Sequence, residues 1–357
     1  MTPDEEREWR QSIEAEDDCE ALEKIMAWNL PMTDGFFEAP SGSRLHVRAT
    51  LPSGQPPKAV LLYCHGLNGH VNGRWWAGHY MPLIASKGLA VFAVDIMGHG
   101  YSEGERAFVE EWDQVFDDLS AFLEALFGVA EPPLDDDDFC AGVSAQVLAH
   151  IRTLNMFVIG QSMGGMIGMY MGLRLQSHEK LQDKFRGAVL GCPSLAVDLP
   201  AAPVQFLLRN IVVPVFKHHE MPSFLSSSSK SMSSWSYDLQ DTTMRQQAEM
   251  DIRDCAARFP DKGLGWQQRM RWGTAGAFSE IFGRIEEDME EVEYPFLLIH
   301  DAEDKVCFIS GSEKLMELSG SDDKTLHRMD ARGLHCLAMV ATEEYVSKMV
   351  DWIYRHL

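Results

Sequence analysis

The chain has 357 residues, 45% of them hydrophobic and 24% charged, which fits a globular protein with a sizeable core. Its 54 acidic and 31 basic residues give a formal net charge of −23, and such a surface repels phosphate backbones, so nucleic acid is excluded as a partner. The seven cysteines have no paired spacing, so neither a disulfide framework nor a metal site is expected. With no signal peptide and no apolar run of membrane-spanning length, the sequence predicts a soluble cytoplasmic protein.

The first half of the chain predicts strands and helices in alternation. Residues 1–30 form an acidic N-terminal extension, and turn formers between 36–39 and 44–49 predict a β-hairpin. Apolar runs predict buried strands, and stripes of helical period predict helices between them. The strands are expected at 59–64 and 89–94, and the helices at about 76–86 and 111–127. An acidic insertion near 131–140, with four successive aspartates, lacks the ligand spacing of a calcium loop and is expected to be a surface loop.

The second half continues this pattern around one interruption. Residues 196–275 hold apolar helical stretches and no convincing strand, so they are predicted to form an inserted helical cap, or lid, between core segments 31–195 and 276–357. The remaining core strands are expected at 155–159, 187–192, 294–300 and 324–329, and the remaining helices at 165–173, 311–318 and 342–354. Continuous apolar strands that alternate with helices predict an α/β fold whose mostly parallel sheet has helices on both faces.

The segment Gly160-Gln161-Ser162-Met163-Gly164 joins a predicted strand to a predicted helix. A serine on so sharp a turn takes a strained backbone conformation, and the two glycines let strand and helix approach closely. The turn would expose the Ser162 hydroxyl beside a helix N-terminus, which favours a nucleophile over a plain glycine-rich turn.

A serine nucleophile needs an imidazole to accept its proton and a carboxylate to orient that imidazole. Functional loops follow the carboxyl ends of parallel strands, which selects Asp304 and His335, in the chain order Ser-Asp-His. Asp301, immediately adjacent to its strand, is the second candidate for the acid, with capping of the loop as its alternative role. His300 and His327, at or within strands, are expected to be structural.

The tetrahedral intermediate also needs two N–H donors directed at its oxyanion. Met163 follows the nucleophile directly and supplies one candidate. Leu67, in the loop after the strand that ends at Cys64, supplies the other, because Gly66 allows the backbone amide to turn inward.

Together these motifs resemble the α/β-hydrolases, and among them the monoacylglycerol lipase and lysophospholipase branch. The resemblance covers about residues 35–357 and rests on the segments His65-Gly66-Leu67, Asp95 to Gly104, Gly160 to Gly165, Asp304-Lys305-Val306 and His335. It implies a catalytic triad of Ser162, Asp304 and His335, oxyanion amides at Leu67 and Met163, and no cofactor or metal. Two departures bear on substrate identity: Gln161 stands where this branch usually has histidine, and the acidic insertion is additional.

The apolar segment 203–216 within the predicted cap is interrupted by Arg209 and Pro214. It has two interpretations, the internal core of the cap or an amphipathic lid that contacts lipid and a peripheral membrane surface. The cap residues expected to contact substrate are Phe206, Leu207, Ile211 and Val212.

The leading hypothesis is a serine hydrolase that cleaves a lipid ester, monoacylglycerol or lysophospholipid, through an acyl-enzyme. A proline iminopeptidase or a carboxylesterase of small esters would use the same triad. A third alternative is a non-catalytic ligand receptor on the same fold. The aspartate nucleophile of epoxide hydrolases and dehalogenases is absent, because the turn carries Ser162.

Overall fold

The computed structural model describes residues 32–67, 69–73, 75–130, 143–222, 270–331 and 333–357. The predicted N-terminal extension, the acidic insertion and residues 223–269 of the predicted cap lie outside these ranges. Those three predictions therefore stay predictions.

Eight strands in the described residues form one sheet in the order β1-β2-β4-β3-β5-β6-β7-β8. The antiparallel pairs are β1–β2 and β2–β4, and every other neighbouring pair is parallel. The strands are β1 (Met32–Glu38), β2 (Arg44–Thr50), β3 (Ala59–Cys64), β4 (Leu89–Val94), β5 (Met156–Gln161), β6 (Phe185–Gly191), β7 (Phe296–Asp301) and β8 (Lys324–Met329). The predicted α/β architecture with a mostly parallel sheet is confirmed.

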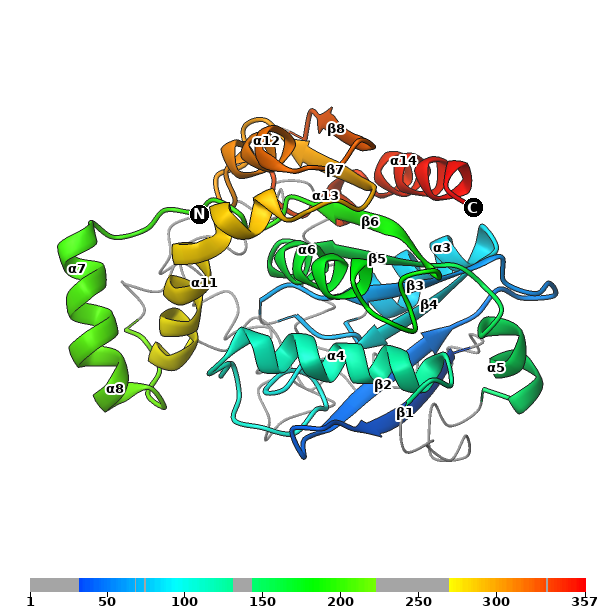
Figure 1. The fold of residues 1–357 in the computed structure, drawn as a ribbon, viewed down its shortest axis with the longest axis horizontal. Helices are drawn as coiled ribbons and strands as arrows, with labels where there is room; N and C mark the ends of the chain where they lie inside the picture. Colours follow the sequence, from blue (N-terminus) through cyan, green and yellow to red (C-terminus); the bar gives the residue numbers. More distant parts are fainter. Residues whose placement is uncertain (1–31, 68, 74, 131–142, 223–269, 332) are drawn as a thin grey trace, which may run out of the picture.

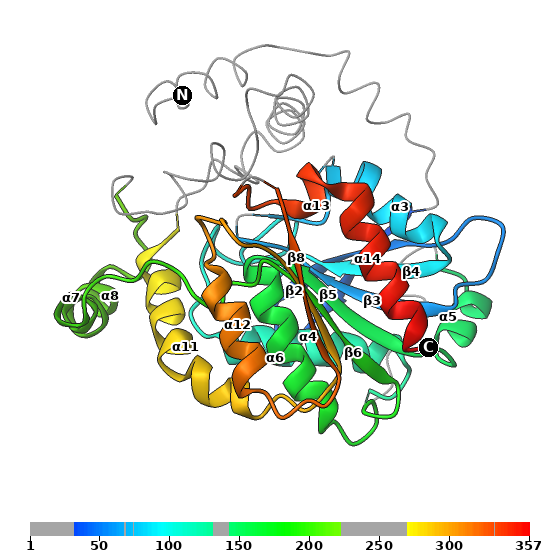
Figure 2. The same ribbon diagram turned by 90° about the horizontal axis from the view of Figure 1, so that it is seen from above.

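Helices cover both faces of this sheet, as Figure 2 shows. On one face lie η1 (Trp76–Tyr80), α3 (Met81–Ser86), α13 (Leu337–Val340) and α14 (Thr342–Arg355). On the other lie α4 (Trp112–Leu126), α6 (Met163–Gln176), α11 (Trp272–Glu290) and α12 (Ile309–Leu318). The short helix α5 (Ala145–Ile151) lies beside the edge of the sheet (Figure 1).

The central strands are apolar throughout because each supplies both layers of the core. In β3, Leu62 and Cys64 face the layer that contains α4 and α6, whereas Leu61 and Tyr63 face the layer that contains α3 and α14. All of these side chains are buried. Burial on both faces removes the polar positions that an edge strand would show.

The described part of the predicted cap is helical. It contains α7 (Ala202–Leu207), η2 (Leu208–Val212) and α8 (Val213–Phe216), which run end to end and lie against α11 at one end of the molecule (Figure 1). The boundary predicted after residue 275 falls inside α11, whose buried side chains at Ala277, Ile281, Ile285 and Met289 continue one helical stripe. None of the helices within the described ranges is long and apolar enough to cross a bilayer.

Candidate active site

Ser162 occupies the turn between β5 and α6 with a backbone φ of 61° and ψ of −126°. A left-handed φ is strained for a residue with a side chain and persists only where neighbouring contacts enforce it. Here the Ser162 N–H donates to the Gly191 carbonyl at 2.9 Å, and its carbonyl accepts from the N–H groups of Gly165 and Ser194, each at 2.9 Å. The sharp turn predicted from the sequence is thus held from both β6 and α6.

The two flanking glycines are required by close contacts between main-chain segments. A Cβ placed on Gly160 would lie 2.1 Å from the Gly164 carbonyl oxygen, and one on Gly164 would lie 2.0 Å from the carbonyl oxygen of Cys64. Both distances are far below van der Waals contact, so only glycine allows α6 to start this close to β3 and β5.

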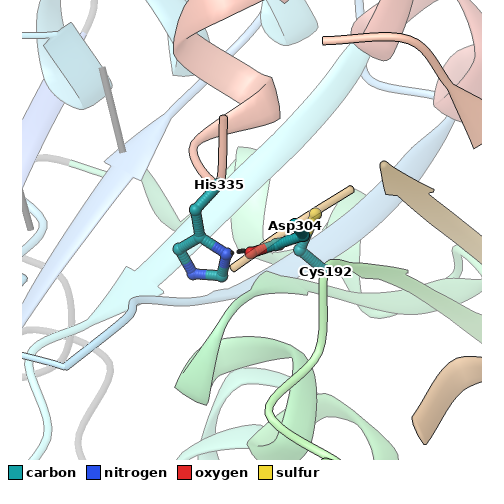
Figure 3. Close-up of side chains that lie close together, drawn as sticks. All are labelled: Cys192, Asp304 and His335. Carbon is teal, nitrogen blue, oxygen red and sulfur yellow. Dashed lines mark hydrogen bonds and ion pairs between the residues drawn. The ribbon is translucent and has the colours of Figure 1, made fainter. Parts of the chain in front are cut away.

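His335 and Asp304, which lie in loops after β8 and β7, meet in a buried hydrogen bond. The His335 Nδ1–H donates to Asp304 Oδ2 at 2.7 Å, as drawn in Figure 3. Asp304 Oδ1 accepts from the backbone N–H groups of Val306 at 2.8 Å and Cys307 at 3.1 Å. Burial alone would raise the pKa of Asp304. The charge of His335, the His300 ring 3.6 Å away and the hydrogen bonds from His335 and Val306 hold it well below its ordinary value. Asp304 is therefore an anion placed to fix the orientation of the His335 ring.

The opposite ring nitrogen of His335 is available for proton transfer. Nε2 is buried and has no hydrogen-bond partner among the described residues. The Ser162 hydroxyl does not bond to this nitrogen in the structure. The structure thus joins the predicted base to the predicted acid. A Ser162–His335 bond would form with substrate bound, because catalytic contacts commonly tighten at that stage.

Asp301, the rival acid, has a structural role. Its Oδ2 accepts from the N–H groups of Ala331 and Gly333, the latter at 3.2 Å, and its Oδ1 accepts from Glu303 at 2.7 Å. These contacts hold the loop after β8 against the end of β7. Asp301 thus caps the loop, which is the alternative role given to it in the sequence analysis. His300 is also structural, as predicted, because its ring bonds to Ser312 at 2.7 Å and Cys307 at 2.9 Å.

The two predicted oxyanion residues flank the same turn. Met163 is the first residue of α6, so its N–H is one of the orphan donors of a helix N-terminus. Leu67 follows Gly66, and a Cβ placed on Gly66 would lie 3.6 Å from the Ser162 Cβ. The loop after β3 therefore runs alongside the serine, and both residues stay predictions as oxyanion donors.

The loop that carries Leu67 is anchored by groups whose contacts the sequence did not reveal. His65 Nδ1 donates to the Gly66 carbonyl at 2.8 Å while Nε2 accepts from the Ile96 N–H at 3.1 Å, and burial lowers the pKa of this ring. Asp95 accepts from the Val71 N–H at 2.6 Å. This contact fastens the far end of the same loop to the end of β4.

Asp95 is itself held as a buried anion. It pairs with His46 at 3.0 Å across 49 residues of sequence. Burial would raise the pKa of Asp95, but the His46 hydrogen bond and charge, with the neighbouring His70 and His65, lower it to about 2. Among the sequence signals only the segment Asp95 to Gly104 pointed to this region, and it did not identify the partner.

Gln161 links the turn at Ser162 to the loop that carries His335. Its side-chain N–H donates to the His335 carbonyl at 2.9 Å, and its side-chain oxygen accepts from the Ala338 N–H at 3.2 Å. Gln161, which departs from the branch that the sequence resembles, therefore fixes the backbone of the loop that carries His335. The single amide group of Gln161 acts as donor in one contact and as acceptor in the other.

Cys192, Asp304 and His335 present sulfur, oxygen and nitrogen atoms within 4.8 Å of one another (Figure 3). These are ligand types that Zn²⁺ uses, but bonds of about 2.0–2.3 Å in a tetrahedral site keep ligand atoms more than about 3 Å apart. The 2.7 Å contact between His335 and Asp304 is a hydrogen bond, and an ion could enter only by breaking it. The geometry fits proton sharing better than metal binding.

The predicted cap residues lie apart from this cluster. Phe206, Leu207 and Ile211 are exposed, with 69% of Phe206 accessible, and Val212 is half-buried. Figures 1 and 2 place their helices beyond α11, on its side away from α6. The described residues therefore do not bring these four side chains to the predicted triad.

A family model and the similar proteins agree on the kind of protein to which this chain is related. Residues 55–339 match the model of a hydrolase family described as serine aminopeptidase, S33. The chain is 26% identical over 289 residues to the monoglyceride lipase of Homo sapiens, covering 80% of this chain and 78% of that protein. It is 23% identical to the caffeoylshikimate esterase of Arabidopsis thaliana, covering 82% and 75% of the two chains.

A solved structure agrees with this likeness at the level of the fold. The monoacylglycerol lipase of Paleococcus ferrophilus superimposes with a TM-score of 0.58 at 20% identity, covering 88% of this chain and 99% of that one. The chain thus belongs to the serine aminopeptidase S33 family, has the α/β-hydrolase fold, and is an ester hydrolase that resembles the monoglyceride lipases.

Proposed function

We propose that this hydrolase cleaves the carboxylic ester of a single-chain lipid, monoacylglycerol or lysophospholipid, through an acyl-enzyme on Ser162. The observation that carries the proposal is the buried pair His335–Asp304, joined at 2.7 Å, whose outer nitrogen has no partner in the described residues. A base oriented by an anion and placed beside a strained serine turn is the arrangement that acyl transfer needs.

In the proposed reaction the Ser162 oxygen attacks the ester carbonyl as its proton passes to His335 Nε2. The tetrahedral oxyanion receives hydrogen bonds from the Leu67 and Met163 N–H groups, each donor being worth about 3–4 kcal/mol. Asp304 stabilises the imidazolium formed at His335. The C–O bond of the ester then breaks, and the imidazolium gives its proton to the leaving alcohol.

Deacylation repeats these steps with water. His335 removes a proton from water, the hydroxide attacks the acyl-enzyme, and the Ser162 oxygen leaves with the proton returned by His335. The products are a carboxylic acid and an alcohol. The residues in this scheme supply every proton transfer it requires, so the proposal includes no cofactor.

Two observations support a lipid as the acyl donor. The similar human and Paleococcus ferrophilus proteins are named as lipases of monoacylglycerols. In this chain, the helices α7 to α8 expose several large apolar side chains, a density that is unusual on a protein surface. They are Val204, Phe206, Leu207, Ile211, Val215 and Phe216.

We propose that this exposed face meets a membrane or micelle surface from which substrate enters. The net charge of −23 disfavours anionic lipid, so neutral phosphatidylcholine vesicles are the expected partner. In flotation assays the chain should co-migrate with such vesicles, and Phe206→Glu should weaken this association. Unchanged flotation of the variant would contradict the membrane role.

A substrate panel tests the proposed specificity. The purified protein should turn over long-chain monoacylglycerol and lysophosphatidylcholine with higher kcat/KM than p-nitrophenyl acetate or a prolyl-peptide amide. A preference for the prolyl amide would identify an iminopeptidase, and a preference for the short ester would identify a small-ester carboxylesterase. Absence of turnover on all four, with no covalent labelling of Ser162, would favour the receptor alternative.

A further inference from the structure

The loop after β6 contacts both halves of the predicted triad, through a residue that the proposed mechanism does not use. The Ser194 N–H donates to the Ser162 carbonyl at 2.9 Å, so this loop is fastened to the turn that carries the proposed nucleophile. The Ser194 hydroxyl is hydrogen-bonded to the Cys307 thiol, with 3.1 Å between Oγ and Sγ, across 113 residues of sequence. Ser194 therefore joins the turn at Ser162 to the loop after β7.

Cys307 extends this connection to the predicted acid. Its backbone N–H donates to Asp304 Oδ1 at 3.1 Å, while Asp304 Oδ2 accepts from His335 Nδ1 at 2.7 Å. A continuous series of contacts thus runs from the Ser162 carbonyl through Ser194 and Cys307 to the acid and the base. Within this series, the side-chain contact Ser194–Cys307 lies between the two halves of the triad.

The Ser194–Cys307 contact is a hydrogen bond between two neutral groups. Burial, followed by the negative charge of Asp304, raises the pKa of the Cys307 thiol to about 12, so the thiol keeps its proton at neutral pH. A hydroxyl and a thiol can each donate to the other. Both residues are more than nine-tenths buried, and in such surroundings a hydrogen bond is stronger than in water.

The backbone of Ser162 depends on contacts of this kind. Its left-handed φ of 61° persists only where neighbouring contacts enforce it. The Ser162 carbonyl accepts at 2.9 Å from the N–H groups of Gly165 and Ser194. Gly165 belongs to α6, the helix that follows Ser162 directly, whereas Ser194 belongs to the segment that reaches the acid. Of these two bonds, the one from Ser194 therefore relates the position of Ser162 to that of Asp304.

A backbone contact between the same two loops stays in place when either side chain is shortened. The Phe308 N–H donates to the Ala196 carbonyl at 2.8 Å. This bond holds the loops after β6 and β7 together without any side chain. Truncation of Ser194 or Cys307 therefore loosens the alignment of the two loops and does not separate them.

We propose that Ser194 is a positioning residue of the hydrolase, whose hydrogen bond to Cys307 keeps Ser162 aligned with the Asp304–His335 pair. This inference rests on the proposed triad. Proton transfer from Ser162 to His335 needs the two reacting atoms within hydrogen-bond reach, and small displacements of such groups lower the rate steeply. Loss of the link should therefore lower kcat. KM should stay constant, because neither Ser194 nor Cys307 binds substrate in the proposed mechanism.

The test is a double-mutant cycle on kcat for a p-nitrophenyl ester. Ser194→Ala and Cys307→Ala each remove one partner of the bond, and each should lower kcat about fivefold, the effect of one lost hydrogen bond. The double variant should also lose about fivefold, because both substitutions remove the same contact, whereas independent effects would multiply to about 25-fold. Cys307→Ser keeps a hydroxyl that can bond to Ser194 and should retain the wild-type kcat.

A spectroscopic measurement separates positioning of the triad from a purely structural role. The proton that His335 shares with Asp304 gives a low-field NMR signal, which is observed without turnover. This signal should shift in Ser194→Ala and Cys307→Ala, and it should stay at the wild-type position in Cys307→Ser.

The control is Ser41→Ala, which removes a serine hydroxyl that bonds to Asp118 at 2.8 Å across 77 residues, in the turn between β1 and β2 at the opposite edge of the sheet from β8. It should lower the melting temperature without changing kcat or the NMR signal. Wild-type kcat in Ser194→Ala, a multiplicative loss in the double variant, or equal losses in Cys307→Ser and Cys307→Ala would overturn the inference. A lower melting temperature of Ser194→Ala with an unmoved NMR signal would also overturn it. Failure of the proposed triad would be recognised separately, because Ser162→Ala would then keep its activity.

Discussion

Replacing the triad acid by its amide, Asp304→Asn, tests the mechanism at one hydrogen bond. In the wild type one carboxylate oxygen accepts from the N–H groups of Val306 and Cys307, and the other accepts from His335. Asparagine has only one acceptor oxygen. If that oxygen stays with the two backbone donors, the amide N–H₂ faces His335 Nδ1. The imidazole must then carry its proton on Nε2, where it cannot accept the proton of Ser162.

The opposite orientation of the amide restores the correct tautomer but leaves the two backbone N–H groups facing a donor. Each buried unmet donor costs about 1–3 kcal/mol, so this orientation lies about 2–6 kcal/mol above the first. The lost charge of Asp304 also no longer stabilises the imidazolium. Together these effects predict a fall in kcat of about 10⁴-fold, equivalent to about 5 kcal/mol.

The assay is steady-state hydrolysis of a p-nitrophenyl ester, with KM expected to change by less than about threefold because substrate binding does not involve Asp304. Asp301→Asn is the matched control, since Asp301 is a buried acid at the end of β7 that accepts from backbone N–H groups and has no hydrogen bond to His335. It should lower the melting temperature while reducing kcat far less. A variant Asp304→Asn with more than a tenth of wild-type kcat, or a larger kcat loss in Asp301→Asn, would refute this reasoning.

Three further predictions follow from buried contacts. Gly164→Ala should lower the free energy of unfolding, measured with denaturant, by at least about 3 kcal/mol, because its Cβ would lie 2.0 Å from the carbonyl oxygen of Cys64. The control Gly283→Ala places its Cβ in open space and should be neutral or stabilising. Gln161→Met should lower kcat about tenfold at constant KM, since it removes both bonds to the base loop; unchanged kcat would exclude a positioning role. The pKa of Asp95 falls from 3.8 to about 2 on folding. Above pH 4 the Asp95 carboxylate therefore contributes about 2 kcal/mol to the free energy of unfolding. This contribution is lost as the pH falls through about 2. The difference in free energy of unfolding between wild type and Asp95→Asn should shrink between pH 4 and pH 2. A difference that stays constant would contradict this role of Asp95.

The strands and the triad candidates could be predicted because each depends on local sequence. Buried parallel strands are apolar throughout, so runs such as Ala59–Cys64 are recognisable, and the residues that follow them lie at one edge of the sheet. Ser162, Asp304 and His335 all follow strands in this way. Their spatial proximity follows from the topology.

The supporting contacts could not be predicted, because they join residues that are distant in sequence. Asp95 and His46 are 49 residues apart, and Gln161 reaches a carbonyl 174 residues away. The left-handed backbone of Cys192 has no sequence signature, since the position holds neither glycine nor asparagine. Composition predicts an end of the cap at residue 275, whereas the helical stripe of α11 runs through this position.

The central claim, that Ser162 is the nucleophile, is tested most directly by covalent labelling. The wild-type protein should react with a fluorophosphonate, mass spectrometry should find the adduct on the peptide that contains Ser162, and long-chain monoacylglycerol should slow the reaction by competition. Ser162→Ala should remain unlabelled while keeping the wild-type circular dichroism spectrum. An unlabelled wild type, or equal labelling of Ser162→Ala, would contradict the account.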